Sequence, residues 1–228
     1  MEFKNIITKY SDNTPIRILL SNTLPIIGPS IDMVLTTYAD DIYKKRVDKL
    51  FEILNKTLEN LQMEKIDKKF LQSESFFDIF RLYFEKSIKT RQEEKVHHFA
   101  QILVETIKEP NLIELSESAV EKISVLTLKD LLVVKHMYDK NSRNSELFAD
   151  PSNIGPGDSL SLKRIPNNLP EVEDFPGKNI SNEDIELSMH NLISVGFVRE
   201  FSGGAGTYKG GWYFITPLLK EIIKKLFS

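Results

Sequence analysis

The sequence contains no cysteine. It therefore cannot form a disulfide bond, hold a metal through thiolates or use a cysteine as a nucleophile. It also lacks a strong excess of charge of either sign, since its formal net charge is -3. A molecule with this charge has no overall attraction for nucleic acids or acidic membranes, so such binding would require a local basic patch.

No apolar run is both long enough and sufficiently free of charge to cross a bilayer. The first ten residues lack the apolar core of a secretory signal peptide, and we expect a cytoplasmic protein. Residues 16–35 are the most hydrophobic segment, but Arg17, Asp32, Pro25 and Pro29 interrupt it, whereas a membrane-spanning helix needs about 20 mainly apolar residues. We expect this segment to lie in the core of a helical bundle.

In an alternative hypothesis, the protein is a membrane-acting effector. Residues 16–35 would then leave the bundle and insert into the interface of a bilayer, since they have enough apolar surface to bind there. The residues proposed to contact the membrane are then Leu19, Leu20, Ile26 and Ile27.

Recognisable catalytic motifs are also lacking, including hydrolase triads, a P-loop and a paired zinc motif. Glu94 and His97 have the spacing used by di-iron proteins, which need a second such pair and two further carboxylates. None of the other three histidines has a glutamate three residues before it. The sequence therefore predicts a non-enzymatic protein without a metal, a cofactor or a small-molecule substrate.

Helical periodicity, in contrast, covers most of the first 140 residues. The expected helices run from after Ser30 to about Gln62, from Ser73 to Ile88, from a capping box at Thr90 and Glu93 to a stop before Pro110, from Ser116 through Ile123, and from Thr127 to Tyr138. The helix that begins at Ser73 has an aromatic stripe, which is typical of a buried core. The last helix carries Leu131, Leu132, Val134 and Tyr138.

The first of these helices is too long to cover its own apolar seam, so it requires a helical bundle or a partner helix. Such seams commonly pair with another helix. We therefore expect self-association or binding of a protein partner through this seam. The residues proposed for this contact are Val47, Leu50, Leu54, Leu58 and Leu61.

The last 48 residues follow the order of a winged helix. A capped helix begins at Ser181, and Gly196 is suited to end it in a left-handed conformation. Two strands at residues 197–201 and 212–215 flank a glycine-rich wing, and Thr216 with Pro217 begins a closing helix. The apolar residues expected on the first helix are Ile185, Leu187, Leu192 and Ile193.

The predicted fold is therefore mainly α: a helical bundle followed by a C-terminal winged-helix-like module with a two-stranded β-wing. We expect the bundle domain to span residues 1–125 and the winged-helix-like domain to span residues 126–228. Prolines and glycines break every periodic pattern in residues 141–179, which we interpret as a long insertion in the second domain.

The charges of this module disfavour binding of DNA. The helix in the recognition position carries Glu183, Asp184 and Glu186 and no lysine or arginine, whereas a helix that reads the major groove is normally rich in these two residues. A protein-contacting or structural winged helix is the favoured interpretation, and nucleic-acid binding is the alternative. The residues proposed for that alternative are Lys44, Lys45, Arg46, Arg199, Tyr208 and Lys209.

Two stretches together resemble the abortive-infection alpha family of bacterial and phage-associated helical proteins. One is the apolar entrance punctuated by Gly28 and Pro29 before a long charged helix. The other extends from SESFF at residues 73–77 to TRQEEK at residues 90–95. The resemblance covers roughly residues 16–140. It implies a role in phage defence or exclusion and assigns no functional residue.

Overall fold

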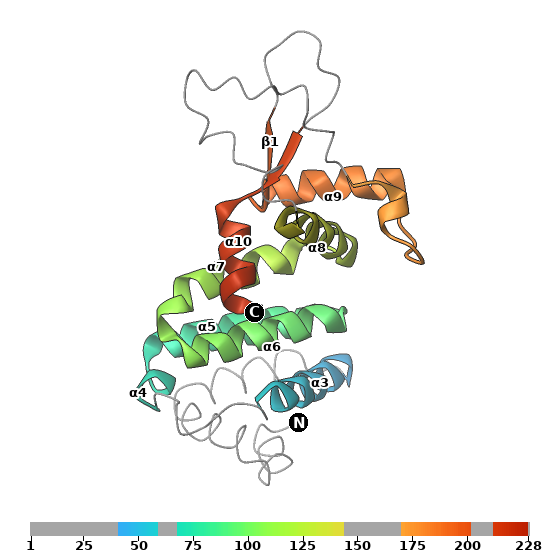
Figure 1. Cartoon of the computed structure of the whole chain (residues 1–228). Coiled ribbons are helices and arrows are strands. Elements are labelled where there is room, and N and C mark those ends of the chain that lie inside the picture. Colours follow the sequence, from blue (N-terminus) through green and yellow to red (C-terminus); the bar gives the residue numbers. More distant parts are fainter. Residues whose placement is uncertain (1–40, 59–67, 144–169, 202–211, 228) are drawn as a thin grey trace, which may run out of the picture. The chain divides into compact units, whose positions relative to one another are not determined.

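The computed structural model describes residues 41–58, 68–143, 170–201 and 212–227. These residues are mainly helical, with one small antiparallel sheet of two strands (Figure 1). The chain divides into two compact units. The first comprises Met1–Val125 with Lys225–Ser228, and the second comprises Leu126–Lys224.

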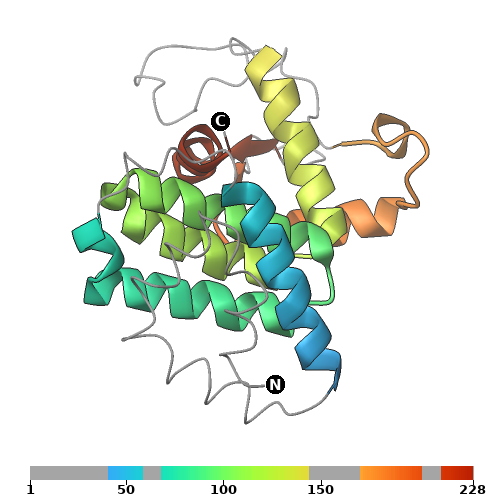
Figure 2. The same cartoon turned by 90° about the horizontal axis from the view of Figure 1, so that it is seen from below.

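The first unit is a bundle of helices. Its described elements are α3 (Asp41–Leu58), α4 (Lys68–Leu71), α5 (Glu74–Lys89), α6 (Glu93–Lys108), the 3-10 helix η2 (Pro110–Leu112) and α7 (Ile113–Val125). Helices α5, α6 and α7 pack against one another, and α3 lies across α5 and α6 (Figure 2). Each helix therefore buries one face against its neighbours in this unit.

The apolar seam of α3 faces the core of this bundle. Val47, Leu50, Leu54 and Leu58 are at most 1% exposed, because α3 packs on α5 and α6 of the same chain. The expectation that these four residues meet a partner is therefore corrected: their apolar surface is already covered within the unit. Leu61, and the parts of the expected helix outside α3, lie outside the described residues.

The predicted aromatic core of α5 is confirmed at five of its six positions. Ser73 begins the helix as its N-cap, and its Oγ accepts a hydrogen bond from the backbone N–H of Phe76 at 3.1 Å. Phe77 is half-buried. The buried members of the stripe are Phe76, Phe80, Tyr83, Phe84 and Ile88.

Two predicted helix starts in the first unit are wrong. Thr90 does not begin α6; it ends α5 as its C-cap, and its Oγ1 accepts a hydrogen bond from the N–H of Gln92 at 3.2 Å. Gln92 is the N-cap of α6 and makes no side-chain capping bond. Helix α7 begins at Ile113 rather than Ser116, and Ser116 lies buried within it, where its hydroxyl forms a hydrogen bond with Thr106 Oγ1 at 2.6 Å.

The second unit combines helices with the small sheet. Its described elements are α8 (Leu128–Arg143), the 3-10 helix η5 (Val172–Asp174), α9 (Asn182–Ser194), β1 (Val198–Phe201), β2 (Trp212–Ile215) and α10 (Pro217–Leu226). The two strands are antiparallel, and Val198 pairs with Ile215 and Phe201 with Trp212. The expected insertion at residues 141–179 begins within α8 and ends after η5, and residues 144–169 lie outside the described residues.

Local capping in this unit follows the sequence. The side chains of Ser181 and Asp184 form a reciprocal capping box at the start of α9. Gly196 follows that helix with φ 75°, the left-handed conformation that glycine adopts without steric cost. Thr216 Oγ1 accepts a hydrogen bond from the N–H of Leu219 at 3.3 Å and so caps α10, whose first residue is Pro217.

The buried faces of α8 and α9 differ from those expected. In α8, Val134 is buried as predicted, but Val133 and Met137 bury the rest of the face, while Leu131, Leu132 and Tyr138 are half-buried. In α9, Leu187 is 58% exposed rather than buried. Leu187 follows Ile185 by two residues, about 200° around a helix, so burying Ile185 turns Leu187 outward.

Candidate functional site

Helix α9 is held on α8 by two polar contacts at the start of α8. Lys129 Nζ forms an ion pair with Asp184 Oδ2 at 2.6 Å. The Nδ2 of Asn191 donates to Asp130 Oδ2 at 3.2 Å, and Asp130 is only 1% exposed. One contact lies in the first turn of α9 and the other in its last turn, so together they fix which side of α9 faces α8.

The remaining side of α9 forms an exposed surface. Between these contacts, Ile185, Ser188, Met189 and Leu192 are buried, which leaves the opposite side of the helix in solvent. We call this side the outward face of α9. Its exposed residues are Asn182, Glu183, Glu186, Leu187, His190 and Ser194.

Acidic groups dominate the outward face. Two hydrogen bonds lower the pKa of the Glu183 carboxyl group. The main one comes from the backbone N–H of Glu183 itself, at the start of the helix, and the second comes from the Ser181 side chain. Glu186 is also exposed, and α9 contains no lysine or arginine. The face therefore presents two carboxyl side chains, Glu183 and Glu186, beside an apolar residue, Leu187.

Asp184 is acidic as well, but its charge is neutralised within the unit. The hydrogen bond from Lys129 is the main cause that lowers the pKa of Asp184, and the backbone N–H of Ser181 adds to it. The acidic groups on the two sides of α9 thus differ: Asp184 has a cationic partner on α8, whereas Glu183 and Glu186 point to solvent.

A third contact attaches the chain before α9 to α8. His136 Nε2 lies 3.3 Å from Asp174 Oδ2, and the His136 ring lies 5.2 Å from the ring of Phe175, centroid to centroid. Phe175 is 6% exposed. These contacts fasten η5 to α8 and so help to position the start of α9.

The residues proposed to contact nucleic acid are divided between the two units. Lys45 is exposed on α3 in the first unit, and Arg199 is exposed on β1 in the second unit. Arg46 Nη1 donates to the backbone carbonyl of Ile88 at 2.9 Å, so it serves the end of α5. The side chain of Lys44, and the whole of Tyr208 and Lys209, lie outside the described residues.

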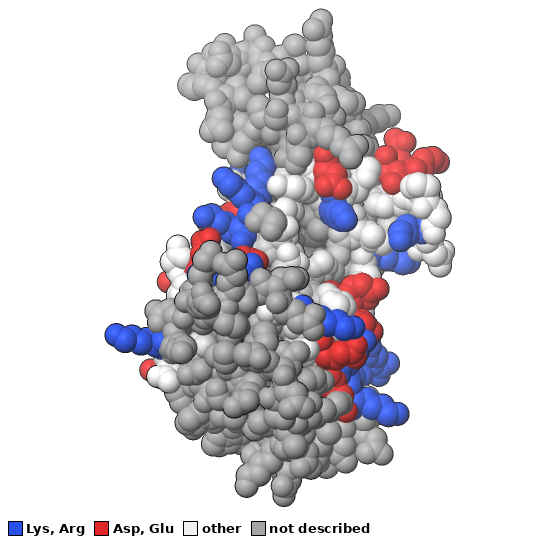
Figure 3. Space-filling view, turned by 60° about the horizontal axis from the view of Figure 1, so that its bottom comes forward, with Lys and Arg blue, Asp and Glu red and all other residues white. Residues whose placement is uncertain are grey.

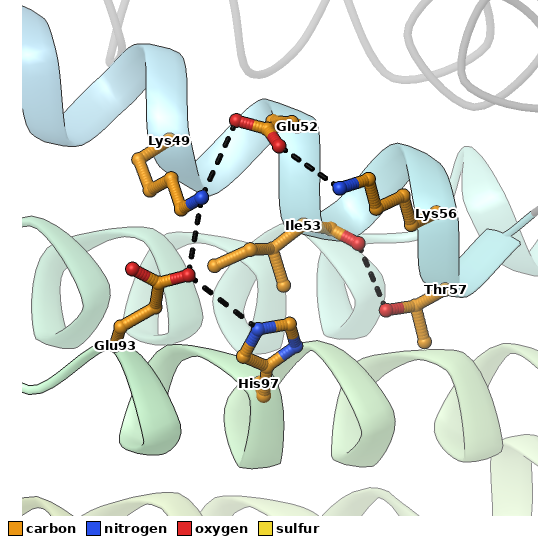
Figure 4. A network of polar contacts seen from close by, with 7 residues as sticks. All are labelled: Lys49, Glu52, Ile53, Lys56, Thr57, Glu93 and His97. Atoms are coloured by element: carbon orange, nitrogen blue, oxygen red, sulfur yellow. Dashed lines mark hydrogen bonds and ion pairs between the residues drawn. The ribbon is translucent and has the colours of Figure 1, made fainter.

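Other charges of α3 are paired with acidic groups (Figure 4). Lys49 Nζ lies 3.1 Å from Glu93 Oε1 and 3.4 Å from Glu52 Oε2, and Lys56 lies 3.0 Å from Glu52. The hydrogen bond to Glu93 is the main cause that raises the pKa of Lys49. In the space-filling view, basic and acidic side chains likewise adjoin one another (Figure 3). This part of α3 is thus a solvated, mixed-charge helix face.

His97 belongs to the same network of charged side chains. Its Nε2 lies 3.8 Å from Glu93 Oε1, one turn earlier on α6. No group of three or more histidine, aspartate or glutamate side chains among the described residues is arranged to hold a metal ion.

The structure does not test the proposed membrane contact of residues 16–35. Leu19, Leu20, Ile26 and Ile27 lie outside the described residues. No helix in the described part of the chain combines the length and the apolarity that crossing a bilayer requires.

The sequence pattern identified the acidic character of α9 but missed the exposure of Leu187 and the role of Asn191. Helical geometry could have revealed the first, since Ile185 and Leu192 lie on one side of the helix and Leu187 on the other. No local signal predicts the second, because the partner of Asn191 is 61 residues away.

Comparisons of this chain with family models, with curated proteins and with solved structures find no match. The function is accordingly inferred from the residues of the chain itself.

Proposed function

We propose that this chain is a non-enzymatic interaction protein, in which a helical bundle is joined to a winged-helix unit that contacts another protein through α9. The order of elements supports the winged helix: two helices, a strand, a glycine-rich connection, a second strand and a closing helix. In this order, α9 occupies the position of the recognition helix.

One observation carries the choice of a protein as the partner. The outward face of α9 exposes Glu183 and Glu186 beside Leu187, and the helix contains no lysine or arginine. A nucleic acid presents a dense row of phosphates, which these carboxylates would repel, and its affinity depends on neutralising those phosphates with lysine and arginine. An apolar residue with acidic neighbours suits a protein surface.

A mobility-shift assay tests the proposal. The full chain is titrated into labelled duplex DNA and single-stranded RNA at low salt, where binding to phosphates is strongest. We expect no shift for either nucleic acid. A shift that Glu183→Lys strengthens and Arg199→Ala weakens would overturn the proposal, since it would place the phosphates on this unit.

Nucleic-acid binding is the second candidate, favoured by one observation. Arg199 is exposed on β1 directly before the wing, which contains Tyr208 and Lys209 in its sequence. Wing residues often contact the phosphate backbone even where the recognition helix does not read bases. In the assay above, this candidate requires a shift that Arg199→Ala removes and that Lys45→Ala, in the other unit, leaves unchanged.

We place this interaction in phage defence or exclusion in a bacterial or phage setting, because of the resemblance of residues 16–140 to the abortive-infection alpha family. Plaque counts on cells that express the chain test this setting. We expect fewer plaques than on cells without the chain, and Leu187→Glu should abolish the difference if α9 contacts the partner. Equal counts with and without the chain, over a panel of phages, would remove the setting but not the interaction.

A further inference from the structure

We infer that the outward face of α9 binds a basic segment of a partner protein, and that this segment covers Leu187 with an apolar side chain. The inference rests on the proposed function and adds the chemistry of the partner. Three observations support it: the exposure of Leu187, the charge beside it, and the pairing of Asp184, on the inward side of α9, with Lys129.

The apolar part of the face is Leu187. Its 58% exposure is unusual here, since the other large hydrophobic residue with comparable exposure in the described ranges is Val125, at 68%. The position is fixed, because Ile185, Met189 and Leu192 hold the opposite side of α9 in the core. Removing an exposed leucine from water is favourable by roughly 25 cal/mol per Å² of apolar surface. A partner with an apolar side chain at this point gains that contribution.

The charged part of the face consists of Glu183 and Glu186. Glu183 lies one helical turn before Leu187, and Glu186 immediately precedes it. Neither glutamate forms an ion pair with any residue of the described part of the chain. Lysine or arginine side chains of a partner would complement these two carboxylates.

The contrast with the inward side strengthens this assignment. Asp184 pairs with Lys129, and Asp130 receives the amide of Asn191 and the N–H of Thr127. The unit thus satisfies the acidic groups that face its own helices, and leaves two carboxylates on the face that has an exposed leucine. Charge complementarity accordingly favours a basic partner segment. The exposed Leu187 favours a segment that also has an apolar residue among its lysines and arginines.

Two labelled peptides test the inference by fluorescence anisotropy with the full chain. Both have the same length and the same leucine positions, but one carries four lysines where the other carries four glutamates. We expect the lysine peptide to bind at low ionic strength, its affinity to fall with added salt, and the glutamate peptide not to bind.

Matched variants locate the binding. Leu187→Ala should weaken binding of the lysine peptide about tenfold, since it removes most of the apolar contact. Glu183→Gln with Glu186→Gln should weaken it about fivefold and flatten its salt dependence. Val125→Ala controls for exposed apolar surface, and Glu173→Gln with Glu221→Gln controls for acidic charge, since all three residues are exposed elsewhere; neither control should change the affinity. Urea unfolding verifies that each variant folds.

Three results would overturn the inference: similar affinities for the two peptides, an effect of Leu187→Ala no larger than that of Val125→Ala, or an effect of the glutamate pair no larger than that of its control. A further result would contradict the inference. If excess unlabelled protein displaced the lysine peptide, and unlabelled Leu187→Ala protein did not, the occupant of this face would be a second copy of the chain. Failure here with no nucleic-acid shift leaves the proposed function standing, whereas a nucleic-acid shift through Arg199 removes both.

Discussion

The side-chain amide of Asn191 donates a hydrogen bond to the carboxylate of Asp130 at 3.2 Å, across 61 residues of sequence. The same carboxylate accepts the N–H of Thr127 at 2.6 Å, while the N–H of Asp130 donates to Thr127 Oγ1 at 3.1 Å. Asp130 therefore completes the capping box of α8 with Thr127 and also holds α9 in place. Because its carboxylate is buried, the loss of either contact leaves a charged group short of hydrogen bonds.

We expect Asn191→Ala to lower the free energy of unfolding by about 1–2 kcal/mol, since it leaves the buried carboxylate of Asp130 without one of its donors. Asp130→Ala removes the cap as well and should cost about 2 kcal/mol or more. The double variant should cost less than the sum of the two, by about 1 kcal/mol. Urea unfolding of the four proteins measures these values, and strict additivity would contradict the coupling.

A second prediction concerns acid and the ion pair of Lys129 with Asp184. Lys129 lowers the pKa of Asp184 in the folded state, so the unfolded chain takes up this proton at a higher pH than the folded chain. The stabilisation is therefore complete above the unfolded pKa, about 3.9, and is lost as the pH falls through the lower folded pKa. Stability should decline in this acidic range, and Lys129→Met should remove part of the decline.

Carboxyl NMR measures this prediction directly. In the wild-type chain Asp184 should titrate below the ordinary aspartate range, and in Lys129→Met it should titrate closer to it. Lys135→Met is the matched control, because Lys135 is exposed on the same helix. An unchanged titration of Asp184 in Lys129→Met would refute the assignment of Lys129 as the main cause.

The third prediction concerns Tyr83 in the core of the bundle. Burial raises the pKa of Tyr83, an effect that the neighbouring Ser87 hydroxyl partly offsets. Yet neither hydroxyl oxygen makes a hydrogen bond of good geometry with the described residues. Tyr83→Phe should therefore leave the free energy of unfolding unchanged or raise it by up to about 1 kcal/mol, since it removes a buried polar group without a well-formed partner.

Thr106→Val provides the contrast for Tyr83→Phe. Thr106 Oγ1 donates to the backbone carbonyl of Ile102 at 2.8 Å and forms a second hydrogen bond, of 2.6 Å, with the hydroxyl of Ser116. Its replacement should cost about 1–2 kcal/mol, because Ser116 then loses its buried partner. Thermal or urea unfolding measures both variants, and a Tyr83→Phe loss as large as that of Thr106→Val would show that the tyrosine hydroxyl is satisfied in solution.

The fourth prediction separates core packing from self-association at α3. Leu54 is fully buried, so Leu54→Ala should lower the free energy of unfolding by about 2–5 kcal/mol and leave the molar mass in light scattering unchanged. Lys56→Ala, at an exposed position of the same helix, should change neither quantity by much. A drop in molar mass in Leu54→Ala with little loss of stability would restore the hypothesis of a partner at this seam.

Local signals in the sequence located the starts of α5, α8, α9 and α10. Ser73, Thr127, Ser181 and Thr216 act as the expected caps, because a capping hydrogen bond joins residues three positions apart. The same kind of signal failed at Thr90. Thr90 and Glu93 have the spacing of a capping box, but α5 continues to Lys89, so Thr90 is the C-cap of that helix instead.

Periodicity similarly predicted that α3 and α5 each have an apolar side, but not what covers it. The seam of α3 has the same sequence pattern whether it meets α5 and α6 or another molecule, since the pattern records only which residues avoid water. The structure decided this by packing the seam within the chain. For α9 the composition revealed an acidic helix, while its orientation was decided by Asp130 and Lys129 on α8.

The sequence alone thus determined the helical class of the chain, the N-caps of α5, α8, α9 and α10, and the acidic character of α9, because these depend on residues within one or two helical turns of each other. Only the tertiary structure decided that Leu187 is exposed, that Val47 and Leu54 are buried, and that Asn191 reaches Asp130. These features depend on which helices pack together, and such contacts join residues far apart in the chain, where no local pattern specifies the partner.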